Sequence, residues 1–371
     1  MSQTVTLDPG SPVENPAVPD IEQPPRRSLT SKLSFGNIGA LYVFAIIIVV
    51  FSVWAPDTFP TWTTVRTIVN QNAIAGIIAL SLVIPLSAGA FDLSIGAIMG
   101  LASIVCAWLL VKKGMPVVPS ILISILVGLL AGLINGALVV VVGIESFIAT
   151  LATGSLMTAA VSMISDYTPI NGPKLSAPGF SNLANASVVG GITTCAFMFL
   201  IVGLVLYVFQ EYTATGRRMF ATGFNLEAAR LTGIRTNRLR FVGLMVSALV
   251  ASIAGVLITA QMQVGQPDVG NPYLLNAFAA VFLGATQFRS GRFNAAGTLV
   301  AVLLLGTGKT GLILVGAQPW GGDMFVGVVL IGALALAAYE RVRGQRRLLA
   351  ARRRASKRRR GSTSQGSAAA G

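Results

Sequence analysis

Residues 117–143 read VVPSILISILVGLLAGLINGALVVVVG, without a single charged side chain. A stretch of about 20 predominantly apolar residues is long enough to cross the hydrocarbon core of a bilayer as a helix. Gly128, Gly132 and Gly136 recur at every fourth position, a spacing that lets helix backbones approach closely in lipid. The run therefore predicts a membrane-spanning helix. We interpret its glycines as contacts within one bundle rather than as a dimerisation face.

The composition extends this prediction to the whole chain. Apolar residues make up 54% of the 371 residues and charged residues 11%, whereas soluble domains carry about 25% charged residues. Long apolar runs predict helices rather than the alternating strands of an outer-membrane barrel. We predict an all-α integral membrane protein, a polytopic bundle of about ten transmembrane helices, some of them short or broken. The candidate spans are 38–54, 71–88, 93–111, 117–143, 146–165, 188–210, 240–262, 273–288, 295–315 and 324–340.

Three regions follow from the position of these runs. Residues 1–34 are polar and rich in proline, which predicts a disordered arm rather than a cleavable signal peptide. Residues 35–340 contain all the spans and form the predicted transmembrane domain. Residues 341–371 form a basic tail, which we interpret as a segment that orients the chain and binds anionic lipid. Nucleic-acid binding is the alternative, and it is disfavoured because the tail has no aromatic residues on which bases stack.

The distribution of charge predicts the topology. Most of the 27 Lys and Arg residues lie in the arm, in the loop around Glu227, near Arg292 or in the tail. Cytoplasmic segments carry an excess of Lys and Arg, so these segments are predicted to lie inside the cell. An even number of spans then places both termini in the cytoplasm.

Cysteine and histidine usage narrows the chemistry. The chain has no histidine, and Cys106 and Cys195 both lie inside apolar runs. We therefore predict no disulfide framework, no His-based metal site and no catalytic residues.

The longest charged loop between two spans contains Asn225 to Ile234, which reads Asn-Leu-Glu-Ala-Ala-Arg-Leu-Thr-Gly-Ile. Alanine and leucine favour a helix, and a glycine suits the left-handed residue that ends one. The loop therefore predicts a short basic helix that a soluble partner contacts. Its candidate docking residues are Asn225, Glu227, Ala228, Ala229, Arg230 and Gly233.

Asp92 is an acidic residue at membrane depth between apolar neighbours. Such a residue is by default a functional candidate. The alternative, which we favour, is that it lies at a helix junction and accepts N–H bonds from Ser94 or Ile95. Gly89 to Gly96 also resembles Gly284 to Gly291 in glycine spacing, as in transporters built from repeats with broken helices.

Other polar residues lie in or beside the spans, where amides, hydroxyls and an aromatic ring suit a path for a neutral polyhydroxylated solute. The alternative for each of them is interhelical hydrogen bonding. The candidate path residues are Asn70, Asn72, Asp92, Ser94, Asn135, Phe147 and Thr150.

Residues 306–310 read Gly-Thr-Gly-Lys-Thr and imitate the end of a phosphate-binding loop. The first glycine of G-x-x-x-x-G-K-[ST] would fall at Leu303, and the stretch lies within an apolar span. We find no nucleotide site, so ATP would have to be bound by another subunit.

These residues resemble the membrane permease subunit of ribose/xylose-type ATP-binding-cassette importers for monosaccharides, over roughly residues 35 to 340. Five stretches carry the resemblance. They are Asn70-Gln71 to Gly76, resembling N-x-x-x-x-x-G-I; Gly89 to Gly96, resembling G-G-I-D-L-S-V-G; Ser146 to Leu151, resembling P-x-F-I-A-T-L; Gly216 to Ile234, resembling G-R-x-x-x-A-x-G-x-N-x-x-A-A-x-x-x-G-I; and Ala277 to Thr298, resembling A-x-A-A-V-x-L-G-G-T…G-G-R-G…G-T. The chain departs from the pattern at Pro85, Glu145, Thr158-Ala159 and Phe288-Arg289.

The resemblance implies an inner-membrane permease for a sugar, working as a dimer of permeases that line one path. It implies two ATPase subunits, which bind the ATP, and an extracytoplasmic substrate-binding protein. Closure of the ATPase pair would push on Asn225–Ile234, with Glu227 and Arg230 as the docking contacts. The alternative is a passive channel or facilitator for small polar solutes, which would have no need of the basic loop.

Overall fold

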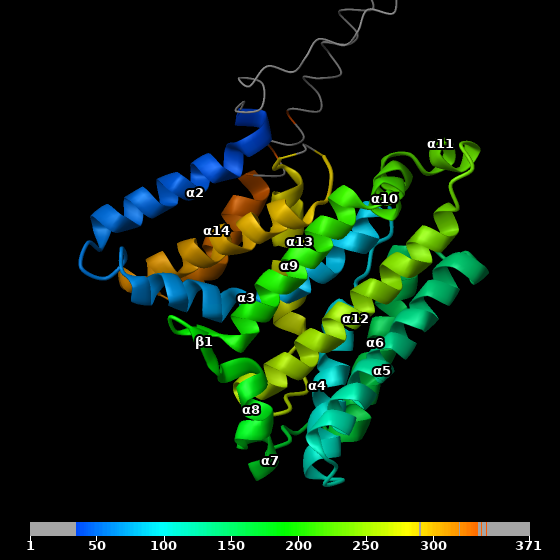
Figure 1. Ribbon diagram of the computed structural model, residues 1–371, viewed down its shortest axis with the longest axis horizontal. Coiled ribbons are helices and arrows are strands. Elements are labelled where there is room, and N and C mark those ends of the chain that lie inside the picture. Colours follow the sequence, from blue (N-terminus) through cyan, green and yellow to red (C-terminus); the bar gives the residue numbers. More distant parts are fainter. Residues whose placement is uncertain (1–34, 289–290, 319, 333–334, 336–338, 340–371) are drawn as a thin grey trace, which may run out of the picture. The chain divides into compact units, whose positions relative to one another are not determined.

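The computed structural model describes residues 35–288, 291–318, 320–332, 335 and 339. The predicted arm (1–34) and tail (341–371) lie outside the described residues, as does Arg289. The described part consists of helices joined by turns and loops, with one small hairpin (Figure 1). Its elements are α2 (Phe35–Trp54), α3 (Trp62–Ser87), α4 (Ile95–Val111), α5 (Val117–Ala137), the π-helical η1 (Leu138–Val142), α6 (Ser146–Ser165), α7 (Pro173–Ser176), α8 (Pro178–Asn185), β1 (Ser187–Val189), β2 (Ile192–Thr193), α9 (Thr194–Tyr212), α10 (Ala214–Phe224), α11 (Leu226–Leu231), α12 (Thr236–Met262), α13 (Asn271–Ala285) and α14 (Ala295–Leu314).

Apolar helices dominate the described residues. Six are long and apolar enough to cross a membrane: Trp62–Ser87, Val117–Val142, Ser146–Ser165, Thr194–Tyr212, Thr236–Met262 and Ala295–Leu314. Shorter apolar helices are Leu41–Trp54, Ile95–Val111, Asn271–Ala285 and Trp320–Gly332. The prediction of an all-α membrane protein is confirmed.

The predicted sixth span, 188–210, begins too early. Residues 187–193 form the antiparallel hairpin β1–β2, with Ser187 opposite Thr193 and Val189 opposite Ile192, and α9 starts only at Thr194. Gly190 and Gly191 have φ of 60° and 85°, a conformation that glycine adopts without strain. This turn separates the first residues of the predicted span from α9, so the helix is shorter than the apolar run.

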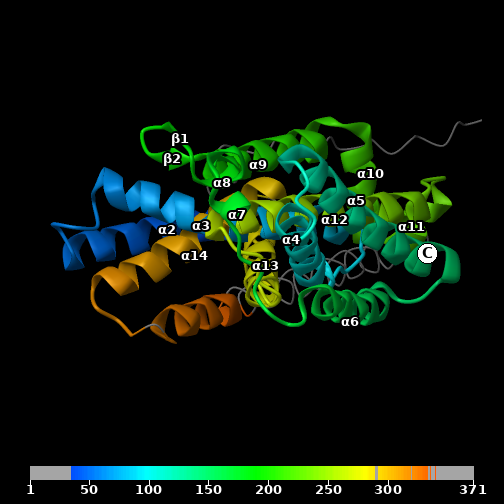
Figure 2. The same cartoon turned by 90° about the horizontal axis from the view of Figure 1, so that it is seen from below.

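Helix α12 lies at the centre of the bundle and packs against α3, α4 and α5. The glycines of α5 face α12: a Cβ at Gly128 would lie 1.7 Å from Ser252 Oγ, and one at Gly132 would lie 2.5 Å from Ala248 Cβ. Only glycine permits this approach. The interpretation of these glycines as contacts within one bundle is confirmed, and Figure 2 shows α5, α6 and α12 on the same side.

Two helices are interrupted in related ways. Gly89, with φ of 72°, ends α3, and the N–H of Ala90 donates to the carbonyl of Pro85 at 2.9 Å, the long bond of a Schellman motif. Pro85 therefore lies in the last turn of α3 and does not disrupt its centre. Residues 90–94 are not helical before α4 begins. We call Gly89–Ser94 the first break.

The second break separates α13 from α14 and comprises the described residues of 286–294. Phe288 and Gly291 have φ of 57° and 83°, and the Asn294 side chain accepts the N–H of Gly297 at 2.7 Å at the start of α14. The two glycine-spaced segments that resembled each other in the sequence thus both join a pair of apolar helices. The stretch 306–310 lies inside α14 and is not a loop.

Candidate functional site

The first break is fixed by Asp92, whose side chain is fully buried. Its Oδ1 accepts the backbone N–H of Ser94 at 3.0 Å and the Ser94 hydroxyl at 2.6 Å. The expectation that Asp92 accepts a bond from the start of the next helix is confirmed for Ser94. Among the described residues, Oδ2 of Asp92 has no hydrogen-bond partner.

The amide of Asn135 extends this contact to α5 and α6. Its Nδ2 donates to Ser94 Oγ at 2.8 Å, and its Oδ1 accepts the hydroxyl of Thr153. All three side chains are buried. Thr153 was not predicted, although its place three residues after Thr150 puts both hydroxyls on one face of α6.

Two hydroxyls of α6 satisfy the main chain of the first break. Ser146 Oγ accepts the N–H of Phe91 and Thr150 Oγ1 accepts the N–H of Leu93, both at 3.0 Å. A buried backbone N–H without a partner would cost about 1–3 kcal/mol, so these bonds allow a non-helical segment inside an apolar bundle. Asp92, Ser94, Asn135, Ser146, Thr150 and Thr153 together are called the break network.

Three predicted path residues lie outside the break network. Asn70 clamps the hairpin: its Nδ2 donates to the carbonyl of Gly191 and its Oδ1 accepts the N–H of Thr193, both at 3.0 Å. Asn72 donates to the carbonyl of Ile68 at 2.7 Å. Phe147 is 47% exposed. The structure therefore brings together Asp92, Ser94, Asn135 and Thr150 and gives Asn70 and Asn72 separate partners.

Glu145 departs from the resembled pattern for a structural reason. Its Oε2 accepts the N–H groups of Phe147 at 2.8 Å and Ile148 at 3.3 Å. It therefore caps the N-terminus of α6, where a carboxylate also interacts favourably with the helix dipole.

The second site is the loop made by α10 and α11. Asn225 Oδ1 accepts the N–H of Ala228 at 3.0 Å and caps α11, and Gly233, with φ of 82°, follows its end. The predicted short helix is confirmed. Glu227, Ala228 and Arg230 are exposed on it, and Ala229 is buried beneath it. The preceding helix α10 was not predicted.

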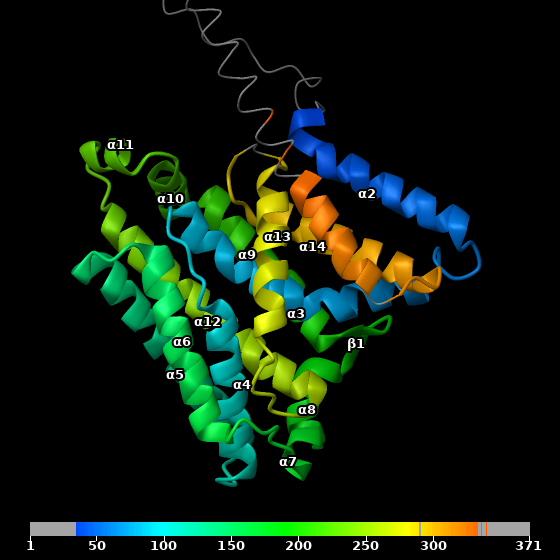
Figure 3. The ribbon, with the colours of Figure 1, turned by 180° about the vertical axis from the view of Figure 1, so that it is seen from behind.

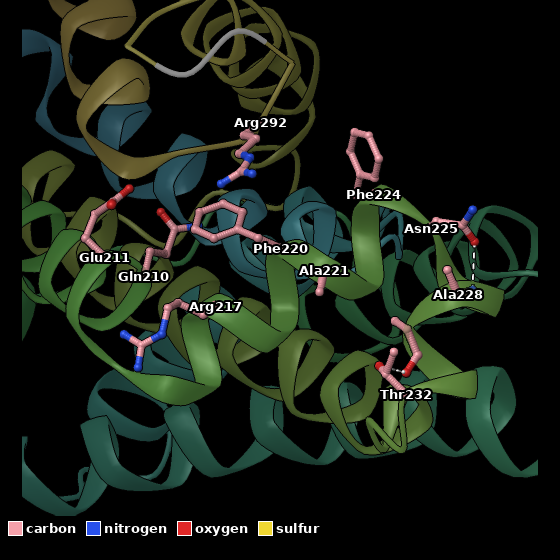
Figure 4. A pocket seen from close by; sticks show the side chains of 11 residues that line it. Gln210, Glu211, Arg217, Phe220, Ala221, Phe224, Asn225, Ala228, Thr232 and Arg292 are labelled. Atoms are coloured by element: carbon pink, nitrogen blue, oxygen red, sulfur yellow. Dashed lines mark hydrogen bonds between the residues drawn. The ribbon is translucent and has the colours of Figure 1, made fainter. Parts of the chain in front are cut away.

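A cavity of about 570 Å³ opens beside these helices (Figure 4). Side chains from the end of α9, from α10 and α11, and from the second break line it. The Arg292 guanidinium lies 5.6 Å from the centre of the Phe220 ring, a cation–π distance. Arg292 joins this site from a segment about 70 residues away along the chain, so sequence spacing gave no signal for it.

Two large apolar side chains of the α10–α11 loop are exposed. Phe224 is 88% exposed and Leu231 is 89% exposed, in a loop that also exposes several arginines. Exposed apolar residues surrounded by charge are typical of protein contact surfaces. The sequence reasoning did not predict Phe224 or Leu231 as contact residues. It counted Arg217 and Arg292 only in the distribution of charge, and the structure places both in the lining of the cavity.

A family described as "Branched-chain amino acid transport system / permease component" matches residues 64–334. The chain belongs to this permease family. The match runs from α3 to the last described helix and includes both breaks and the α10–α11 loop. The permease-subunit resemblance is confirmed.

Several relatives of this permease are named as sugar transport proteins. It is 34% identical to a ribose import permease protein of Bacillus subtilis (strain 168), over 81% of this chain and 92% of the relative. It is 29% identical to a D-allose transport system permease protein of Escherichia coli (strain K12), over 82% and 92%. An L-arabinose transport system permease protein of the same strain is 29% identical over 84% and 94%. No solved structure matches the permease.

Proposed function

We propose that this chain is the permease subunit of an ATP-binding-cassette importer that carries a monosaccharide across the bacterial inner membrane. The observation that carries the proposal is the 34% identity to a ribose import permease over 81% of the chain. Relatives named for allose and arabinose extend the solute class to monosaccharides in general. The family description names branched-chain amino acids instead, and we make these the competing substrate in the test.

We propose ten membrane segments, formed by the six long apolar helices and the four shorter ones. Both termini and the α10–α11 loop would then face the cytoplasm. The basic residues of this loop support that orientation through the excess of Lys and Arg on cytoplasmic segments. The short helices α4 and α13 each adjoin a break, as expected for discontinuous spans.

We propose that the α10–α11 loop receives the ATPase subunit, which binds the ATP. Glu227 and Arg230 are exposed there beside the cavity and are the proposed docking contacts, supported by Asn225, Ala228, Ala229 and Gly233, which build the helix. An extracytoplasmic substrate-binding protein and a second copy of this permease complete the proposed assembly.

The proposed path runs past the first break, with Asn70, Asn72, Asp92, Ser94, Asn135, Phe147 and Thr150 as its candidate residues. Four of these residues shape the break through the break network. Their proposed role is to position the wall of the path, because their polar atoms other than Asp92 Oδ2 bond within the bundle.

Reconstitution into liposomes with the cognate ATPase and binding protein tests the proposal. Labelled ribose and labelled leucine are supplied outside, with ATP or a non-hydrolysable analogue inside. We expect ribose uptake only with ATP. Uptake of leucine in place of sugars would overturn the sugar assignment, and equal uptake without ATPase subunits would favour a passive channel.

A further inference from the structure

A buried amide connects the two breaks. Gln210, near the end of α9, is 2% exposed. Its Nε2 donates to Ser87 Oγ at 2.8 Å, and its Oε1 accepts the N–H of Ala295 at 2.9 Å. Ser87 is the last residue of α3 and Ala295 the first of α14. One side chain therefore bonds to the helix end before the first break and to the helix start after the second.

Further bonds connect the same groups, and the set of Ser87, Gln210, Phe293 and Ala295 is called the junction. Gln210 Nε2 also lies 3.3 Å from the carbonyl of Phe293, and the Ser87 hydroxyl lies 3.0 Å from the same carbonyl. Both polar atoms of the Gln210 amide are thus engaged. A fully satisfied buried network fixes one arrangement of the elements that it joins.

The α10–α11 loop contacts the same junction through its backbone. A Cβ on Gly223 of α10 would lie 2.4 Å from the carbonyl oxygen of Ser87 and 3.3 Å from the N of Gly89. At the other end of α10, a Cβ on Gly216 would lie 2.4 Å from the carbonyl oxygen of Gln210. Helix α10 is therefore pressed against α3 and α9 with no side chain between them to absorb a displacement.

Gln210 also lines the cavity beside α10 and α11, together with Phe220 and Arg292 (Figure 4). Arg292 directly precedes Phe293, whose carbonyl belongs to the junction. A protein bound at the cavity would therefore contact Gln210, which belongs to the junction, and Arg292, which is covalently linked to Phe293 of the junction.

We propose that Gln210 is a positioning residue that couples the docked ATPase to both breaks. Movement of α10 shifts Ser87 and Gly89 through the Gly223 contact, and Gln210 makes the start of α14 move with them. This inference rests on the proposed function, since it assumes that the ATPase docks on α10 and α11.

The test replaces Gln210→Met, which keeps the size of the side chain but removes its donor and acceptor. The full importer is reconstituted, and uptake per ATP hydrolysed is measured together with ATPase co-purification. We expect normal co-purification and ATP hydrolysis, with uptake per ATP about tenfold lower, a typical size for coupling between sites. Asn185→Leu is the matched control, because it removes an amide that joins α8 to the end of α12, and it should keep the wild-type ratio.

Gly223→Ala tests the same coupling from the backbone side and should also lower uptake per ATP. Its control is Gly179→Ala, where an added Cβ meets nothing within 4 Å. Wild-type uptake per ATP in both Gln210→Met and Gly223→Ala would overturn the inference. Failure of both variants to assemble would also overturn it, because the inference gives both residues a role in coupling and not in folding. Failure of the wild-type protein to bind the ATPase would instead overturn the proposed function.

Discussion

The break network and the α10–α11 loop are both polar interruptions of an apolar bundle, but they are built in opposite ways. In the break network, buried hydroxyls and amides bond to one another and to the main chain. In the loop, Glu227, Arg230, Phe224 and Leu231 are exposed. Helices α10 and α11 stand at the opposite end of the helices from α7 and α8 (Figures 1 and 3). The loop touches the first break only at its start, where a Cβ on Gly223 would lie 3.3 Å from the N of Gly89.

This difference separates two kinds of polar residue in a membrane protein. Side chains whose bonds are completed inside the chain stabilise an irregular backbone. Side chains that are exposed at the end of the bundle are available to a partner. Substitutions in the first region should therefore change stability, and those in the second should change assembly and transport.

The largest expected effect is that of Glu227→Lys. Reversal of a charge at the docking contact should lower ATP-dependent uptake about hundredfold or more, since an unpaired interfacial charge costs several kcal/mol. The free energy of unfolding should change by less than about 0.5 kcal/mol, because Glu227 is exposed. Uptake assays and thermal unfolding of the same preparation measure both. Normal uptake would remove Glu227 from the docking surface.

Asn135→Leu should lower the stability of the permease, whereas Glu227→Lys should lower its uptake. It leaves the hydroxyls of Ser94 and Thr153 without the amide, and we expect a loss of about 1–2 kcal/mol in stability. Thermal unfolding in detergent measures the loss. Asn276→Leu is the control, because it removes only a bond to Pro272 of the same helix. Equal stability of the two variants would contradict the structural role of the break network.

Leu231→Ala should weaken binding of the purified ATPase about tenfold, as expected for an apolar contact residue at an interface. Stability should not change. Leu275→Ala, which truncates another exposed leucine, should leave the affinity at its wild-type value. An unchanged affinity in Leu231→Ala would show that the ATPase docks elsewhere.

Asp92→Asn should have the smallest effect. Asparagine keeps the oxygen that accepts the bonds from Ser94, so stability should change by less than about 1 kcal/mol and uptake should persist. Stability and uptake are measured side by side. Loss of uptake with stability unchanged would show that the path requires the charge itself.

Local features of the sequence predicted much of this architecture. Apolar runs located the helices, and Asn225 and Gly233 mark the ends of α11. The glycines of residues 117–143 predicted close packing within the bundle, and the structure supplies α12 as the helix that they contact. Each of these signals depends on neighbours along the chain or on one helix face. Asp92 also bonds within two residues, which is why its role at the helix start was predictable.

The remaining contacts join residues far apart in the sequence. Ser87 and Gln210 are separated by 123 positions, and Asn70 meets Thr193 across the same separation. A buried glutamine near a helix end has no spacing that identifies its partner. The hairpin was missed for a similar reason, because its apolar strands continue the composition of α9.

Cysteine cross-linking tests the central claim most directly, namely that the α10–α11 loop is the surface that receives the ATPase. The native Cys106 and Cys195 are buried, so a cysteine introduced by Leu231→Cys is selectively reactive. Val189→Cys, at a hairpin residue that is 71% exposed, is the control at the other end of α9 from α10. We predict an adduct with the ATPase from Leu231→Cys alone. An adduct from Val189→Cys, or none from Leu231→Cys in an importer that transports, would contradict the account.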